Sequence, residues 1–116
     1  MKPPRITGYR FGRLEVDGKP YTRDVIICPD QVRGNWWREQ GHVLNLQDLD
    51  EVLQIGPEVL IVGQGAFGRM RVPQETRAGI RSRGIELIVL PTQEACEAYN
   101  RLREQRRVVA ALHLTC

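Results

Sequence analysis

Residues 58–90, "EVLIVGQGAFGRMRVPQETRAGIRSRGIELIVL", place two short apolar runs on either side of a polar segment. The run over residues 59–62 lacks polar alternation, which is typical of a strand covered on both faces, and residues 85–90 are read as a second buried strand. Between them, Pro73 suits the start of a helix over residues 74–83, and Gly84 ends that helix. A strand, a helix and a second strand in this order predict two parallel strands joined by a right-handed crossover.

The glycines of this stretch have the G-x-G-x-x-G spacing of a dinucleotide-binding loop, at residues 63, 65 and 68. That motif works when the helix begins inside the loop, because its free N–H groups then face the pyrophosphate. Here Pro73 disfavours a helical conformation at Val72, so the helix starts late and the loop is too long. The acidic residue at the expected distance, Glu86, lies near the start of its strand rather than at the end. We therefore exclude a dinucleotide site and expect no cofactor.

Two interpretations of residues 63–72 stay open. The first is a small-anion site, since the loop follows a buried strand, exposes backbone N–H groups and is followed by arginines. The second is a tight turn with close backbone packing, which needs no ligand and which we favour. The candidate ligand or partner contacts here are Gly63, Gln64, Gly65, Arg69, Arg71, Arg77 and Arg81.

Upstream, residues 9–30 have the pattern of a β-hairpin. One arm includes Phe11, Leu14 and Val16, residues 25–28 form the other, and "DGKP" (17–20) supplies the turn. Residues 1–7 are expected to be a loose N-terminal tail, and residues 31–42 are expected to be irregular.

Two further helices and a last strand complete the chain. Asn45 and Asp48 form a capping-box-like pair at the start of a helix over residues 45–53, which Gly56-Pro57 ends. A longer helix begins after Pro91, with Thr92 as its cap, and "VVAALHL" (108–114) reads as a strand. The order β-β-α-β-α-β-α-β predicts an α/β layered domain with a mixed sheet. At 116 residues, the chain has the length of a single domain, 1–116.

Composition narrows the function further. The net charge is only +3, and acidic residues are interspersed among the arginines, so nucleic-acid binding is not expected. The N-terminus has no apolar core of a signal peptide, and no apolar run could span a membrane. Three cysteines, none close in sequence to another, fit neither a disulfide framework nor a zinc site. We expect a soluble cytoplasmic protein with reduced thiols that contacts no membrane.

Few other residues suggest chemistry. Trp36 and Trp37 are candidates for a partner surface, with one of the two buried and the other half-exposed. His113 and Cys116 could form a nucleophile pair only if the chain turned after Leu114, and no third group orients them. His42 is isolated, so no metal site is expected, and we assign no catalytic residue.

Several blocks of the sequence resemble a known family. "FGRLEVDGKPYTRDVII", "PEVLIVGQG", "GIELIVLPTQEACEAYN" and "RRVVAALHLTC" are similar to small domains of unknown function. That family includes the mitochondrial complex I assembly factor and the adipogenesis-associated domain protein of animals, and many single-domain members of bacteria and archaea. The resemblance implies a three-layer α/β domain with a mixed central sheet, one strand antiparallel to the rest, and the N-terminal β-hairpin as an extra layer. Members often have a small hydroxyl residue where this chain has Gln64.

The resemblance implies no enzyme activity, and its better-known eukaryotic members act through protein partners. We therefore predict an uncharacterised bacterial or archaeal protein that is a non-enzymatic interaction or assembly module with an unidentified protein partner. The alternative is a small-molecule or anion-binding domain, enzymatic or not, with its site at the glycine loop 63–72. The absence of an acid–base pair, metal cluster or activated nucleophile in the sequence favours the first.

Overall fold

The computed structural model describes residues 2–116 and contains a five-stranded mixed sheet in the order β5-β4-β8-β6-β7. Its strands are β4 (Val25–Ile27), β5 (Val32–Arg33), β6 (Val59–Gln64), β7 (Glu86–Leu90) and β8 (Val108–His113). β6 pairs in parallel with both β7 and β8, whereas β4 is antiparallel to β5 and β8. One strand, β4, thus runs against the other four, as the resemblance implied.

The two central strands are buried on both faces because helices or a second sheet cover each side. In β6, Val59 and Ile61 pack in one core, and Leu60 and Val62 pack in the other. This two-sided burial explains the continuous apolar run in the sequence.

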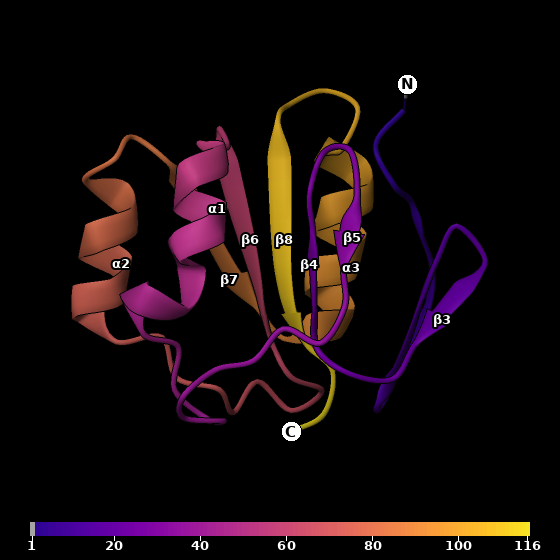
Figure 1. Ribbon diagram of the computed structural model, residues 1–116. Helices are drawn as coiled ribbons and strands as arrows, with labels where there is room; N and C mark the ends of the chain where they lie inside the picture. The colour runs from indigo at the N-terminus through magenta and orange to yellow at the C-terminus, as the bar shows by residue number, and fades with distance from the viewer. Residues whose placement is uncertain (1) are drawn as a thin grey trace.

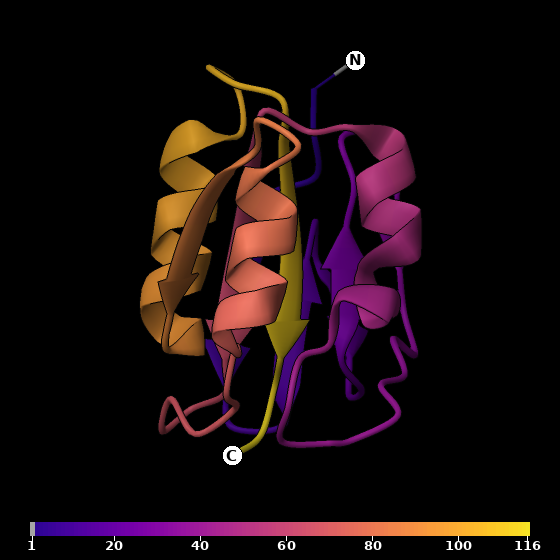
Figure 2. The ribbon, with the colours of Figure 1, turned by 90° about the vertical axis from the view of Figure 1, so that its left-hand side faces the viewer.

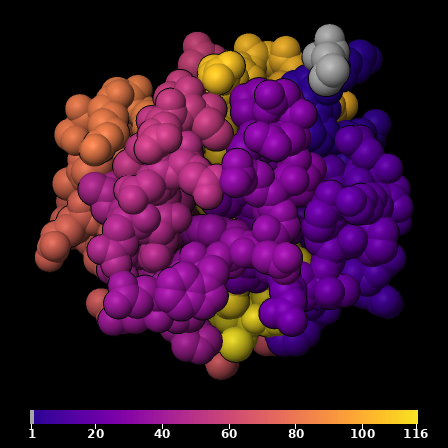
Figure 3. Space-filling model, in the orientation of Figure 1, coloured from indigo at the N-terminus to yellow at the C-terminus, as the bar shows by residue number. Residues whose placement is uncertain are grey.

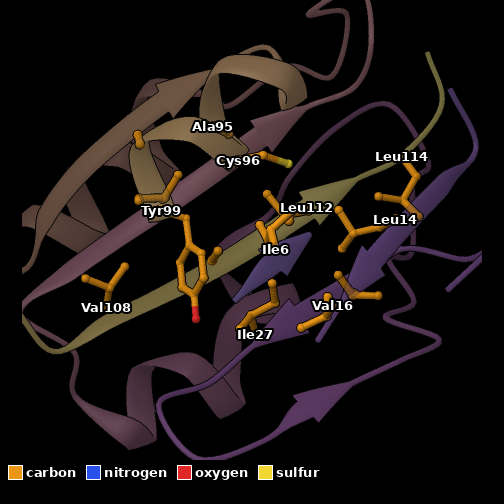
Figure 4. Close-up of a cluster of buried hydrophobic side chains, with 14 of the residues drawn as sticks. Ile6, Leu14, Val16, Ile27, Ala95, Cys96, Tyr99, Val108, Leu112 and Leu114 are labelled. Atoms are coloured by element: carbon orange, nitrogen blue, oxygen red, sulfur yellow. The ribbon is translucent and has the colours of Figure 1, made fainter. Parts of the chain in front are cut away.

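The helices divide between the two faces (Figures 1 and 2). A 3₁₀ helix η1 (Leu46–Leu49) leads into α1 (Asp50–Ile55), and α2 (Gln74–Arg81) follows β6. These elements cover one face, whereas α3 (Thr92–Leu102) covers the other. The α3 face buries Ala95, Ala98 and Tyr99, and Figure 4 shows Ala95 and Tyr99 in this core. The expected helix over residues 45–53 is confirmed, although its first turn is 3₁₀, and Gly56 ends it with a left-handed φ of 66°.

A separate three-stranded antiparallel sheet packs beside α3, formed by β1 (Ile6–Arg10), β2 (Arg13–Val16) and β3 (Lys19–Tyr21). Asp17 and Gly18 have positive φ values of 50° and 81°, which is typical of a two-residue type I′ turn. This turn pairs β2 with β3, so the predicted second arm of the hairpin was wrong. Residues 25–27 join the central sheet instead, where all three side chains are buried.

Two other local predictions need correction. Ile6 and Thr7 belong to β1, and the Tyr99 hydroxyl donates a hydrogen bond to the Pro4 carbonyl at 2.6 Å, so residues 2–7 are not a loose tail. Met1, also predicted in that tail, lies outside the described residues. Thr92 does not cap α3; Pro91 holds the cap position, and the Thr92 hydroxyl donates to the His113 carbonyl at 2.6 Å.

Candidate functional site

Several loops meet where β6 and β8 finish, at the bottom of Figure 1. We call this surface the loop end and define it by four segments: residues 11–12, the tryptophan loop (34–45), the glycine loop (63–72) and residues 114–116. Backbone contacts join the segments, since Gly12 N–H donates to the Leu114 carbonyl at 2.8 Å and Val43 forms a β-bridge with Arg71. The carboxyl ends of parallel strands are the usual ligand-binding edge of an open α/β sheet.

Close packing explains the first two glycines of the glycine loop. A Cβ atom at Gly63 would lie 2.8 Å from the Thr92 hydroxyl and 2.9 Å from a Leu112 methyl group. A Cβ at Gly65 would lie 2.7 Å from the Thr115 carbonyl oxygen, and the φ of Gly65 is 96°. No larger residue fits either position without displacing its neighbours.

The backbone N–H groups of the glycine loop mostly bond within the protein. Gly65 N–H donates to the Thr92 hydroxyl at 2.8 Å, and Ala66 N–H to the Thr115 carbonyl. Gly68 and Met70 N–H groups donate to the carbonyls of Gly65 and Gln64 at 3.2 and 3.0 Å. The Gln64 side chain also turns inward, because its amide donates to the Met70 carbonyl at 3.0 Å. This arrangement agrees with the packing interpretation and leaves few donors for an anion.

The candidate arginines do not form one surface. Arg69 and Arg71 are exposed on the glycine loop, and the Arg69 guanidinium lies 5.5 Å from the centre of the Phe67 ring. Arg77 is half-buried, and its Nε donates to the Val72 carbonyl at 2.9 Å. Arg81 is the last residue of α2, about 10 Å along the helix axis from its first residue. Only Arg69 and Arg71 therefore belong to the loop end.

Three large apolar side chains are exposed in residues 2–116, and all lie at the loop end. Trp37 is 77% exposed, Phe67 65% and Phe11 57%. Phe11 and Phe67 contact each other, with ring centres 6.1 Å apart. Trp36 is half-buried, and its Nε1–H donates to the Asp48 carbonyl at 3.1 Å. The prediction that one tryptophan would be buried was wrong, since Trp37 protrudes and Trp36 lies across the edge of the core.

A polar cluster holds the tryptophan loop on the sheet, and no local sequence pattern indicates it. Asp24 precedes β4, His113 ends β8 and Arg38 follows Trp37. Arg38 Nη1 lies 2.8 Å from Asp24 Oδ2, and His113 Nδ1 lies 2.7 Å from the same oxygen. Leu114 N–H donates to Asp24 Oδ1 at 2.8 Å, and Arg38 Nη2 donates to the Gly41 carbonyl at 2.9 Å. The guanidinium also stacks 4.7 Å from the centre of the Trp36 ring.

The contacts of this cluster determine its protonation. His113 Nδ1 lies 2.7 Å from Asp24 Oδ2, which only accepts, and 3.1 Å from Arg38 Nη2, which only donates, and we assign the hydrogen to Nδ1 from the shorter contact. Burial opposes ionisation of Asp24, but the hydrogen bonds from His113 and Leu114 and the nearby charges outweigh it and lower its pKa below the usual value. An aspartate that orients a histidine is also found in general-base sites. Here His113 is only 6% exposed, and this burial favours a structural anchor, although its Nε2 is buried without a protein partner in residues 2–116.

The thiols and the remaining histidine complete the candidate residues. Cys28 and Cys96 are buried, and burial raises the pKa of Cys96 to about 12. Of the two residues considered as a nucleophile pair, His113 hydrogen-bonds to Asp24 at 2.7 Å, whereas the backbone of Cys116 packs against Gly65. His42 is exposed, with its ring centre 6.4 Å from that of His113. No group of three or more metal-binding side chains is assembled within residues 2–116.

Comparison with known proteins places these features in a family. A model for proteins of unknown function, DUF498/DUF598, matches residues 6–113. The chain belongs to this family. The conserved hypothetical protein PH1505 from Pyrococcus horikoshii OT3 is similar in structure, with a TM-score of 0.82, 28% identity, and coverage of 97% of this chain and 99% of that one.

Two other solved structures share the fold. The protein MT938 is 30% identical with a TM-score of 0.80 over 97% of this chain and 99% of its own. A Bartonella henselae protein described as an outer membrane protein is 26% identical with a TM-score of 0.81 over the full length of both chains. In this chain, none of the helices within residues 2–116 has the length and apolar character needed to cross a membrane. The comparisons thus show the family and the fold.

Proposed function

We propose that the chain is a non-enzymatic interaction or assembly module that binds a protein partner through its loop end. The observation that carries this proposal is that Phe11, Trp37 and Phe67, all more than half exposed, lie in the segments of the loop end, with Phe11 and Phe67 in contact. Tryptophan and arginine are enriched among residues that dominate binding energies, and Arg69 lies over the Phe67 ring. An assembly role would match the eukaryotic proteins that the sequence resembles.

The shape of the loop end also supports a partner surface. Figure 3 shows a hollow in its lower part, where atoms of the C-terminal segment are visible between the segments that surround them. The Arg38–Asp24–His113 cluster fixes the base of the tryptophan loop, so Trp37 is presented on an anchored backbone. A prepositioned aromatic side chain loses less conformational entropy on binding than one on a flexible loop.

The test is quantitative affinity purification from the native cell with the wild type and a Trp37→Ala, Phe67→Ala double variant. A partner recovered by the wild type should bind the double variant at least about 30-fold more weakly, because hot-spot truncations cost 2 kcal/mol or more. The control is Gln93→Ala, Arg101→Ala on the exposed face of α3, which should bind normally. Equal recovery by both variants, with unchanged melting temperatures, would exclude the loop end as the partner surface.

An anion site at residues 63–72 is the alternative. Its support is the exposed pair Arg69 and Arg71, and its weakness is that the loop donates most of its N–H groups to its own protein. Titration with inorganic phosphate, followed by the amide resonances of Gly65, Gly68 and Arg69, tests it. Saturable shifts confined to this loop would favour the alternative over the protein-interaction proposal.

A further inference from the structure

A groove of about 500 Å³ lies beside Trp37, between β5, the tryptophan loop and the start of α1. We call it the Trp37 groove. Ile26, Trp36 and Trp37 provide its apolar lining. The segment between β5 and α1 forms the lower part of the face seen in Figure 3. The groove therefore adjoins the exposed ring on which the proposed function rests.

The charge of the groove is opposite to that of the chain. Four carboxylates line it, from Glu39, Asp48, Asp50 and Glu51, whereas Arg33 is its one cation. The chain as a whole carries +3. A cationic group would therefore be attracted to this recess rather than to the surrounding surface.

Of these four carboxylates, only Glu51 is paired with a cation, and only Asp50 lacks any partner for its side chain within residues 2–116. Glu51 pairs with Arg33 at 2.8 Å, Asp48 accepts the Asn45 N–H at 2.9 Å, and Glu39 accepts the Gln47 amide at 2.6 Å. The Asp50 carboxylate makes neither a side-chain hydrogen bond nor an ion pair with any of residues 2–116. Asp50 and Glu51 occupy the first turn of α1, where carboxylates favour a helix. That position explains why they are acidic, but it does not explain the exposed indole of Trp37, which lines the same groove.

The two tryptophan rings differ in whether a cation already stacks on them. The Trp36 ring already carries the Arg38 guanidinium 4.7 Å from its centre, whereas Trp37 is 77% exposed. A guanidinium binds well where a carboxylate and an aromatic face are both available. We propose that the Trp37 groove binds an arginine side chain of the protein partner, between the Trp37 ring and the Asp50 carboxylate. This inference rests on the proposed function and names the chemistry of its partner.

The probe is a blocked Gly-Gly-Arg-Gly-Gly peptide, and the control is the same peptide with citrulline, which keeps the shape and removes the charge. Binding is followed by ¹⁵N NMR of the wild type, with the Trp37 indole resonance assigned through Trp37→Phe. We expect the arginine peptide to shift the Trp37 indole and the amides of Asp50 and Glu51 saturably, and the citrulline peptide to bind at least about tenfold more weakly. Equal binding of the two peptides, or no saturable shift, overturns the inference.

Variants separate the contributions of charge and ring. Asp50→Asn should weaken binding of the arginine peptide at least about threefold, whereas Asp30→Asn, at an exposed carboxylate outside the groove, should not. Trp37→Phe should retain more affinity than Trp37→Leu, because only phenylalanine keeps an aromatic face. An unchanged affinity of Asp50→Asn contradicts the proposed binding mode.

Partner capture distinguishes this inference from the proposed function. If Trp37→Ala, Phe67→Ala loses the partner while Asp50→Asn keeps it, and the arginine peptide does not bind, the groove inference is wrong and the loop end remains the partner surface. If the aromatic double variant keeps the partner, the proposed function itself is wrong.

Discussion

The glycine loop and the tryptophan loop lie at the same end of the sheet but direct their groups in opposite ways. The glycine loop turns inward, because most of its N–H groups and the Gln64 amide hydrogen-bond to the protein and Gly65 packs against the C-terminal segment. The tryptophan loop is anchored by the buried side chain of Arg38 and exposes the neighbouring Trp37. The motif with the more suggestive sequence therefore has the simpler structural explanation.

The largest expected effect follows from removing the anchor of the tryptophan loop. Asp24→Ala leaves the Arg38 guanidinium buried without its counter-charge and the Leu114 N–H without its acceptor. The free energy of unfolding should fall by roughly 2–4 kcal/mol in denaturant titrations. The control Asp30→Ala, at an exposed carboxylate, should change it by less than about 0.5 kcal/mol. Similar values for the two variants would show that the cluster does not anchor the loop.

In the glycine loop, the addition of a single methyl group should be enough to destabilise the protein. Gly65→Ala places a Cβ atom 2.7 Å from the Thr115 carbonyl oxygen at a φ of 96°, so the C-terminal segment must move. We expect a loss of roughly 1–3 kcal/mol in the free energy of unfolding. Gly41→Ala is the matched control, because no atom lies within 4 Å of the added methyl group and its φ is not positive. Equal stability of both variants would contradict the packing explanation of Gly65.

The difference between the loops also explains what the sequence could predict. The strands at 59–62, 86–90 and 108–113 and the crossover helices follow from local apolar patterns, and the turn at Asp17–Gly18 from local turn chemistry. The strand that pairs with β2 across this turn could not be predicted from local patterns, because β3 and residues 25–28 both follow the turn and both have strand-like residues. Residues 25–27 pair in the central sheet, where all three side chains of β4 are buried.

No local sequence pattern predicts the Asp24–Arg38–His113 cluster. His113 lies 75 residues from Arg38 and 89 from Asp24 in the sequence, and only the pairing of β4 with β8 brings them together. A signal was present, since Asp24 immediately precedes one apolar strand and His113 ends another. Reading that signal required knowing that these two strands are antiparallel neighbours.

A third prediction concerns acid and the tryptophan-loop anchor. The pKa of Asp24 is lower in the folded protein than in the unfolded chain, so its ionisation stabilises the fold above the unfolded value of about 3.9 and this contribution is lost as pH falls through the lower, folded pKa. Urea titrations between about pH 6 and pH 2 should show a steeper loss of stability in the wild type than in Asp24→Asn, which cannot titrate there. Parallel pH profiles would mean that other carboxylates, not Asp24, govern acid unfolding.

The smallest effect on stability is expected from the exposed arginines of the glycine loop. Arg69→Ala, Arg71→Ala should change the free energy of unfolding by less than about 0.5 kcal/mol, because both side chains are solvent-exposed and the Phe67 ring is the one side-chain partner that Arg69 has among residues 2–116. Affinity for the partner found by affinity purification should nevertheless fall, and the difference should be greater at low salt, where charges are less screened. The matched control is Arg81→Ala, Arg83→Ala, which removes two positive charges near the other end of α2. If both double variants weaken binding equally, the effect comes from net charge. If only Arg69→Ala, Arg71→Ala weakens it, the glycine loop contributes charge to the partner surface although its backbone faces the protein.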